Sequence, residues 1–140
     1  MSNSLKPPQT GEGLNSAWSR VVEFHTSLDL PVVSTPVELP KERILIRSKW
    51  MREELAEFEI SNSLTDQVDA LIDLIYLTLG TLVEMGVPPE EAFEIVHQAN
   101  LAKRESTGKI RKTDEGKVVK PPGWEGPEEK LSAYLQRLKT

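Results

Sequence analysis

Three aspartates share one face of the most apolar segment of the chain. The segment runs from Thr65 to Gly80, and Asp66, Asp69 and Asp73 follow one another at spacings of three and four residues. In a helix, these spacings place the three side chains on a common face. The remaining positions are mainly leucine, isoleucine and valine, which predicts a helix that is mostly buried.

This arrangement is costly unless something neutralises the carboxylates. Like charges on one helix face repel, and a carboxylate removed from water needs a partner. The preceding segment holds a second acidic cluster, Glu53-Glu54-Leu55-Ala56-Glu57. A short turn joins the two segments, which predicts antiparallel neighbouring helices whose acids face one another. All-oxygen ligands in that arrangement favour Mg²⁺ or Mn²⁺ over zinc or copper.

Solvated acids are the alternative for both segments. Glutamates spaced like those of residues 53–57 are common on exposed helix faces, and Arg47 or Arg52 can pair with them. The aspartates can likewise form a narrow stripe that faces water. The metal-site hypothesis therefore requires the two acidic faces to point toward each other.

Prolines, glycines and capping residues divide the rest of the chain. Helices are expected from Asn15 or Ser16 to about Leu28, from just after Pro40 to about Ser61, from a cap at Thr65 to Gly86, from Val87-Pro88-Pro89 to about Lys103 and, as a short terminal helix, from Pro127 to Leu138. Residues 1–13 are expected to form a lead-in and residues 30–40, with three prolines, a connector.

These elements predict an all-α chain with a four-helix-bundle core. We expect one domain over residues 1–140, with a helical core over about 14–104 and a basic loop and terminal helix over about 105–140. A chain of 140 residues is long enough to bury a core.

Composition excludes several functions. The absence of cysteine excludes disulfides, thiolate metal sites and thiol catalysis, and two histidines argue against a histidine-rich zinc site. A net charge of -5 argues against nucleic-acid binding by the whole surface. The sequence has no apolar run that would span a membrane, and its first residues lack the apolar core of a signal peptide. The cytoplasm is the expected location.

A basic segment follows the fourth predicted helix. Its cations are Lys103, Arg104, Lys109, Arg111, Lys112, Lys117 and Lys120, mixed with glycine and proline. The pattern predicts a loop, with a short hairpin within 109–119. A Mg²⁺ held by carboxylates takes further ligands from substrate phosphates, and lysine or arginine neutralises the other phosphate oxygens. A solvated tail is the alternative. Trp124 either anchors this loop or stacks on a base.

Four short motifs occur in a fixed order over residues 24–124. They are Glu53-Glu54-Leu55-Ala56-Glu57, Asp73-Leu74-Ile75-Tyr76, Asn100-Leu101-Ala102-Lys103 and the stretch from Gly116 to Trp124. In this order they resemble the all-α nucleoside triphosphate pyrophosphohydrolases of the MazG-like superfamily, whose members include dimeric dUTPases and phosphoribosyl-ATP pyrophosphohydrolase. The resemblance implies hydrolysis between the α and β phosphates of a nucleoside triphosphate, releasing a monophosphate and pyrophosphate, as nucleotide-pool house-cleaning.

The resemblance also implies the residues of the site. Mg²⁺, with Mn²⁺ as a substitute, would be held by Glu54, Glu57, Asp69 and Asp73, and Glu53 would be a further ligand or the base that activates water. Substrate contacts would come from Asn100, Lys103, Arg111, Lys117, Lys120, Arg47 and Tyr76. The family usually has glutamate where this chain has Ala70. We prefer Asp69 as its replacement, and Asp66 stays open.

Members of this superfamily are homodimers or homotetramers whose sites lie at subunit interfaces. The implied partners are therefore a nucleoside triphosphate and further copies of the chain, without nucleic acid or membrane. Ala70 keeps open an alternative function, a catalytically silent bundle of the same fold that binds nucleotide or a partner. A purely structural helical dimer with solvated acids is the third possibility.

Overall fold

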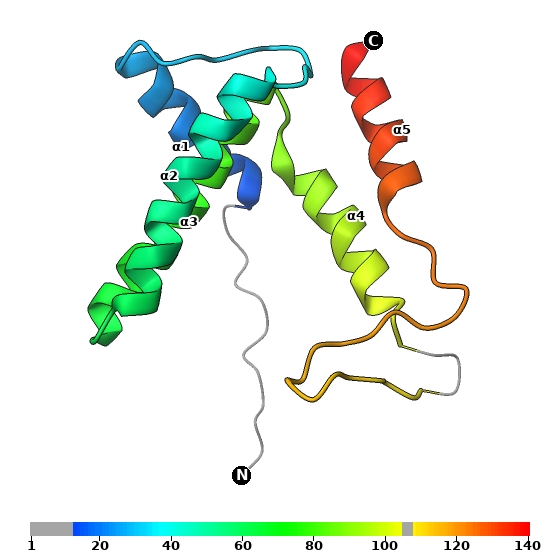
Figure 1. Cartoon of the computed structure of the whole chain (residues 1–140). Coiled ribbons are helices and arrows are strands. Elements are labelled where there is room, and N and C mark those ends of the chain that lie inside the picture. The colour runs from blue at the N-terminus through cyan, green and yellow to red at the C-terminus, as the bar shows by residue number, and fades with distance from the viewer. Residues whose placement is uncertain (1–12, 105–107) are drawn as a thin grey trace.

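The computed structural model describes residues 13–104 and 108–140, and its regular elements in these ranges are helices (Figure 1). They are α1 (Leu14–Ser27), α2 (Lys41–Ile60), α3 (Leu64–Met85), α4 (Pro89–Leu101) and α5 (Glu128–Lys139). The all-α prediction and the terminal helix after the basic loop are therefore confirmed. The expected lead-in lies, up to residue 12, outside the described residues.

The turn between α2 and α3 makes these two helices antiparallel neighbours, as the sequence predicts. The hydroxyl oxygen of Ser63 accepts a hydrogen bond of 3.1 Å from the backbone N–H of Asp66. Ser63 is therefore the N-cap of α3, and the prediction of Thr65 was wrong by two residues. Both residues carry a hydroxyl, so the sequence alone did not separate them.

Gly86 ends α3 in the left-handed conformation, with φ of 71°. The N–H of Gly86 donates to the carbonyl of Val83, and the N–H of Val87 donates to the carbonyl of Leu82. This pair of bonds satisfies the last carbonyls of the helix and needs a residue without a Cβ at the turn. The chain then enters α4 at a bend of 115°.

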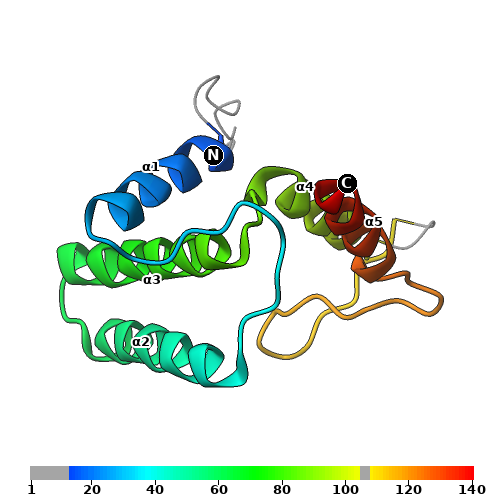
Figure 2. The same cartoon turned by 90° about the horizontal axis from the view of Figure 1, so that it is seen from above.

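The helices form two arms that meet at this bend. In the first, α3 lies between α1 and α2, and these three helices form one layer (Figure 2). In the second, α4 packs against α5 and touches α1 near the bend. We call these the α2–α3 arm and the α4 arm. Among the described residues, no single helix is long and apolar enough to cross a membrane, although α3 and α4 pass that test as a bent pair.

The core is small and lies between α1 and the C-terminal half of α3. It consists of Val21, Leu79 and Val83, with Ala17, Trp18 and Val22 packed against it. The prediction of a mostly buried third helix was wrong for its N-terminal half. There Val68, Ile72 and Ile75 are 49%, 54% and 51% exposed. The physical reason is that α1 covers only the C-terminal half of α3.

A buried ionic network holds α2 to α3. Glu84 of α3 is only 4% exposed and pairs with two arginines of α2. Arg43 donates two hydrogen bonds to its carboxylate, at 2.7 and 3.0 Å. The Nε of Arg47 lies 2.6 Å from Oε2 of the same carboxylate, an oxygen that Arg43 also contacts. Both guanidinium groups also lie 5.2 Å from the ring centroid of Trp50.

His25 extends this network to α1. Its Nδ1 lies 2.7 Å from the carbonyl oxygen of Pro31, and a carbonyl can only accept, so Nδ1 carries the proton. The Nε2 atom is then free to accept from Arg47 at 3.4 Å. Gly80 makes room for this contact, because a Cβ there would lie 2.8 Å from the Arg47 guanidinium.

The charges of the network outweigh the cost of burying Glu84. Burial alone would raise the pKa of Glu84, but the hydrogen bond from Arg43 and the charges of Arg47 and Arg43 lower it overall. A carboxyl whose pKa is lowered by folding stabilises the fold above its ordinary pKa. That contribution is lost as the pH falls through the lowered value.

We expect Glu84→Gln to lower the free energy of unfolding by about 3–5 kcal/mol at pH 7, because it leaves Arg47 as a buried charge without its counter-ion. Urea denaturation at pH 7 and pH 3 measures the effect. The difference from wild type should be smaller at pH 3 than at pH 7, because the stabilisation from Glu84 is lost as the pH falls toward and through its lowered pKa.

The matched control is Glu91→Gln. Glu91 forms an ion pair of similar length, 2.8 Å, with Arg137, but both side chains are at least half exposed. Its removal should cost about 1 kcal/mol or less. Equal losses in the two variants would mean that the Glu84 network does not hold the helices together.

Candidate functional site

The two acidic clusters lie on facing parts of α2 and α3, toward the turn that joins them. Burial raises the pKa of Glu54, and the neighbouring carboxylate of Glu57 raises it further. Across the helix pair, the charges of Asp73 and Asp69 act in the same direction. Glu57, Asp69 and Asp73 are therefore each within electrostatic reach of Glu54, as expected if the acidic parts of the two helices face each other.

One oxygen of this group is buried without a partner. The Oε2 atom of Glu54 is inaccessible to solvent and accepts no hydrogen bond from the described residues. A buried carboxylate oxygen is ordinarily hydrogen-bonded or bound to a cation. Its neighbours are themselves acids, so they cannot supply a donor while ionised. A proton shared with Glu57, whose hydrogen bond also raises the pKa of Glu54, or a bound cation would each satisfy this carboxylate.

The acids do not form a closed metal cage. Within the described ranges, no three acidic or histidine side chains converge tightly enough to hold a metal ion as they stand. The chemistry of the group nevertheless fits Mg²⁺ or Mn²⁺, because its donors are carboxylate oxygens, of which those of Glu54 and Asp73 belong to half-buried residues and those of Glu57 and Asp69 to exposed ones. Two observations support a metal at this place. Oε2 of Glu54 is buried without a hydrogen-bond partner among the described residues, and the charges of Asp69 and Asp73 on α3 act on Glu54.

The remaining acids and Ala70 occupy distinct places. Glu53 is exposed on α2, one residue from the partly buried Glu54. Asp66 is exposed in the first turn of α3, where its N–H is capped. Ala70 is 2% exposed, so a buried methyl group stands at the position where the resemblance implies a glutamate. The expected register, Asp69 with Asp73, places both acids within electrostatic reach of Glu54.

Most of the predicted substrate contacts lie on the α4 arm. Asn100 and Lys103 lie at the end of α4, and Lys120 lies at the far end of the loop. The structure brings Lys103 and Lys120 together at Trp124, with each ammonium nitrogen 5.3–5.4 Å from the ring centroid. The indole N–H of Trp124 donates to the carbonyl of Ala99 at 2.7 Å. Trp124 therefore anchors the loop to α4.

The expected hairpin is present in the loop. Lys112 and Val118 form an isolated antiparallel bridge, and the N–H of Val119 donates to the carbonyl of Arg111 at 2.8 Å. The turn closes between Thr113 and Lys117. Arg111 and Lys117 are exposed on opposite strands of this hairpin.

Two predicted substrate contacts are engaged elsewhere. Arg47 is 5% exposed and paired with Glu84, so the structure gives it a role in joining helices. The sequence shows that Arg47 is charged, but it does not show that Glu84, 37 positions later, is buried and forms an ion pair with it. Tyr76 packs the edge of its ring against Phe24 of α1, with centroids 5.5 Å apart. We therefore leave Arg47 out of the proposed phosphate contacts.

The acidic site and the lysines are apart within one copy of the chain. Both views place the turn between α2 and α3 at one end of the molecule and the basic loop beyond the far end of α4 (Figures 1 and 2). The helix contacts of α4 are with α1 and α5. One chain therefore does not bring the acids and the lysines to one place in this arrangement.

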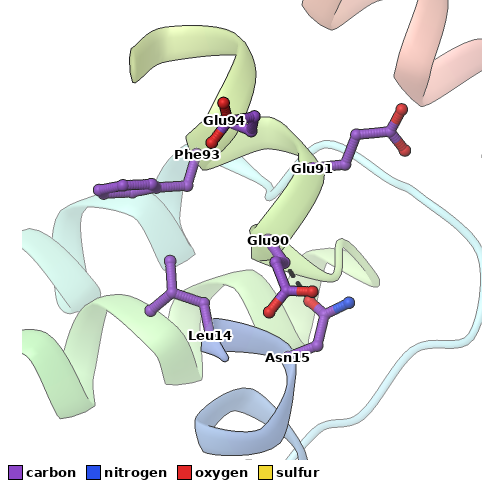
Figure 3. Close-up of a pocket in the computed structure, with 6 residues that line it drawn as sticks. All are labelled: Leu14, Asn15, Glu90, Glu91, Phe93 and Glu94. Atoms are coloured by element: carbon purple, nitrogen blue, oxygen red, sulfur yellow. Dashed lines mark hydrogen bonds between the residues drawn. The ribbon is translucent and has the colours of Figure 1, made fainter. Parts of the chain in front are cut away.

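A hollow of about 680 Å³ lies between the start of α1 and the start of α4 (Figure 3). The side-chain oxygen of Asn15 accepts from the N–H of Glu90 at 3.0 Å and so caps α4. Asn15 was predicted to cap its own helix, and that was wrong, since Gly13 precedes α1 without a side-chain cap. The hollow is lined by Leu14, Asn15, Glu90, Glu91, Phe93 and Glu94, and its three glutamates would repel a phosphate.

The fold and the facing acids define a class of protein, the α-helical nucleotide pyrophosphohydrolases. A family model described as phosphoribosyl-ATP pyrophosphohydrolase matches residues 21–100, more than half of the chain. The chain therefore belongs to the phosphoribosyl-ATP pyrophosphohydrolase family, within the MazG-like superfamily, and is a hydrolase that acts on acid anhydrides. The match includes both acidic clusters and Asn100. No curated protein gives a significant match.

We expect Glu54→Gln to stabilise the protein in the presence of a chelator at pH 7. The substitution removes the carboxylate whose pKa is raised by burial and by its acidic neighbours. The gain should be about 0.5 kcal/mol, the size of a like-charge repulsion on a helix. Urea denaturation measures it. Glu59→Gln, at an exposed position of the same helix, is the control, and a loss of stability in Glu54→Gln alone would contradict the expected repulsion.

Proposed function

We propose that the protein is a Mg²⁺-dependent nucleoside triphosphate pyrophosphohydrolase that cleaves between the α and β phosphates. The observation that carries the proposal is the buried, partnerless oxygen of Glu54, set among the charges of Glu57, Asp69 and Asp73. Facing carboxylates in a chain of a pyrophosphohydrolase family are suited to a metal-bound phosphate chain.

The acids would hold the metal and prepare water. Glu54, Glu57, Asp69 and Asp73 would be the ligands, and bound Mg²⁺ would supply polarisation of the phosphate and a lower pKa of the attacking water. Glu53 is exposed next to the ligand set, where its carboxylate can accept a proton from water. Asp66 remains the alternative third-helix ligand.

The cations of the α4 arm would bind the phosphates. Lys103, Lys120, Arg111 and Lys117 carry positive charge on the loop and at the end of α4, where they can offset the charge of a triphosphate. Asn100 can hydrogen-bond to the phosphates or the sugar. Tyr76 lies one helical turn after Asp73 and is 39% exposed, so it remains a candidate substrate contact.

A second copy of the chain would complete the site. The α2–α3 arm exposes a row of apolar side chains, including Leu55, Val68, Leu71, Ile72 and Ile75, each at least 40% exposed. An apolar surface of this kind marks an interface. The acids and the lysines are on different arms of one copy, so a homodimer or homotetramer could bring the α4 arm of one copy to the acids of another.

The wider role we propose is the removal of surplus or damaged nucleotides in the cytoplasm. The alternative is a bundle that binds nucleotide without turnover, and Ala70 is the residue that favours it, because a glutamate usually present is missing. Turnover decides between the two.

We expect pyrophosphate release from at least one triphosphate when Mg²⁺ is present and none with a chelator. The panel should hold canonical and oxidised nucleoside triphosphates and phosphoribosyl-ATP. Glu57→Gln and Asp73→Asn should each lower kcat about a hundredfold or more, since loss of even an outer partner of a metal ligand costs about ten- to a hundredfold and loss of a ligand costs more. Circular dichroism checks that both variants keep their helices.

Glu59→Gln is the matched control, an exposed glutamate two residues beyond Glu57. It should keep wild-type turnover. Activity retained in both ligand variants would remove the metal-site assignment, while tight nucleotide binding without any release would select the silent bundle.

We expect two impaired variants, Glu57→Gln and Lys103→Ala, to restore activity at low triphosphate concentration when they are unfolded and refolded together. In a dimer of Glu57→Gln with Lys103→Ala, one of the two shared sites has both residues intact. Random pairing should therefore give about a quarter of wild-type activity. Activity no higher than the mean of the separate variants would place the acids and Lys103 of a working site in the same copy.

A further inference from the structure

Trp124 holds two lysines that are 17 positions apart in the sequence. The ammonium nitrogen of Lys103 lies 5.3 Å from the centroid of its ring, and that of Lys120 lies 5.4 Å from it. Lys103 comes from the end of α4 and Lys120 from the loop. The two nitrogens are therefore no farther apart than these two distances together, although no charged group of opposite sign joins them in the described contacts.

The indole is itself fixed. Its N–H donates to the carbonyl of Ala99 in the last turns of α4, at 2.7 Å, and the side chain is half-buried. Trp124 lines a cavity of about 320 Å³ between α4, the loop and the start of α5, together with Lys130 and Glu125, while Lys103 and Lys120 are not part of its lining. The ring thus has a set position on the helix and an open space beside it.

An aromatic face attracts ammonium groups without cancelling their charge. A carboxylate partner would neutralise each lysine, whereas the ring leaves both free to bind an anion. The ring also restricts two long side chains that otherwise lose considerable rotamer freedom when they bind. Two cations restrained on one indole ring, no farther apart than the sum of their distances to it, are pre-organised for an extended ligand with several negative charges.

We propose that Trp124 is a positioning residue that gathers Lys103 and Lys120 into one binding site for a polyphosphate chain. Trp124 itself does not touch the reacting atoms. It presents the two ammonium groups to neighbouring phosphates of the ligand, and its hydrogen bond to Ala99 fixes that site to the end of α4. The inference deepens the proposed function, because the polyphosphate would be the substrate's triphosphate.

The first test measures binding without turnover. Inorganic tripolyphosphate is titrated into the full chain by calorimetry, without divalent metal. We expect Trp124→Leu to weaken binding about tenfold and Trp124→Phe about threefold or less, because phenylalanine keeps an aromatic face but loses the N–H. Lys112→Ala is the charge-matched control in the same loop and should bind within twofold of wild type.

The phenylalanine variant separates positioning from simple anchoring. If Trp124 only fastens the loop through its hydrogen bond to Ala99, Trp124→Phe will bind as weakly as Trp124→Leu, and the proposal fails. Wild-type binding in Trp124→Leu also overturns it. A combined Lys103→Ala, Lys120→Ala variant should lose no further affinity when Trp124→Leu is added, since the ring acts through the two lysines.

A second measurement does not depend on replacing Trp124. The indole N–H signals of the three tryptophans are followed by NMR in ¹⁵N-labelled protein. Tripolyphosphate should shift the Trp124 signal in wild type but not in the combined lysine variant. An unchanged Trp124 signal at saturation, or a shift that persists without the lysines, contradicts the proposal even if Trp124→Leu does not fold.

Kinetics distinguish failure of this inference from failure of the proposed function. With an accepted triphosphate, Trp124→Leu should raise KM about tenfold and leave kcat within twofold, because the lysines hold the phosphates equally before and during reaction. A fall in kcat with unchanged KM overturns the positioning role. If the wild type hydrolyses no triphosphate, the proposed activity fails, and tripolyphosphate binding alone decides whether the lysine site exists.

Discussion

The buried carboxylate of Glu84 is the interaction on which the two central helices depend. Arg43 and Arg47 of α2 both pair with it, and His25 of α1 accepts from Arg47. A desolvated carboxylate between two guanidinium groups is strongly favoured only in one register of the helices, since sliding either helix would leave a charge without its counter-ion. That register also sets which acids of α2 and α3 face each other farther along the pair.

The acidic cluster sits at the opposite end of the same helix pair and has the opposite electrostatics. Near Glu84 the charges compensate, whereas around Glu54 they repel, and burial adds to the cost. Repulsion within such a cluster lowers the free energy of unfolding. At a metal site, binding of the cation ordinarily offsets this loss. The contrast between the two ends of one helix pair is the physical basis for placing function at the acidic end.

Sequence patterns predicted the helices well because they depend on local chemistry. Gly86 at a helix end and the prolines before α4 act within a few residues, and their effects were predicted correctly. The facing of the two acidic segments followed from one short turn.

Long-range partners could not be predicted in the same way. Arg47 pairs with Glu84, and Asn15 caps α4, so both contacts join residues far apart in the chain. From the sequence alone, an arginine or an asparagine has many possible partners. The exposure of the first half of α3 was not predicted, because an apolar stripe in the sequence does not show which part of the protein packs against it.

The corner between the two arms is held by few contacts. The chain itself joins α3 to α4 there. In addition, Asn15 caps the first turn of α4, and the hydroxyl of Tyr134 donates to the carbonyl of Pro88 at 2.7 Å. From this pivot α4 extends 13 residues, or about 20 Å, to the segment that carries Lys103. A rotation of about 10° at the pivot would therefore displace that segment by roughly 3 Å, about the difference between touching a ligand and missing it. The position of Lys103 therefore depends on Asn15 of α1 and Tyr134 of α5, the first and the last helices of the described chain.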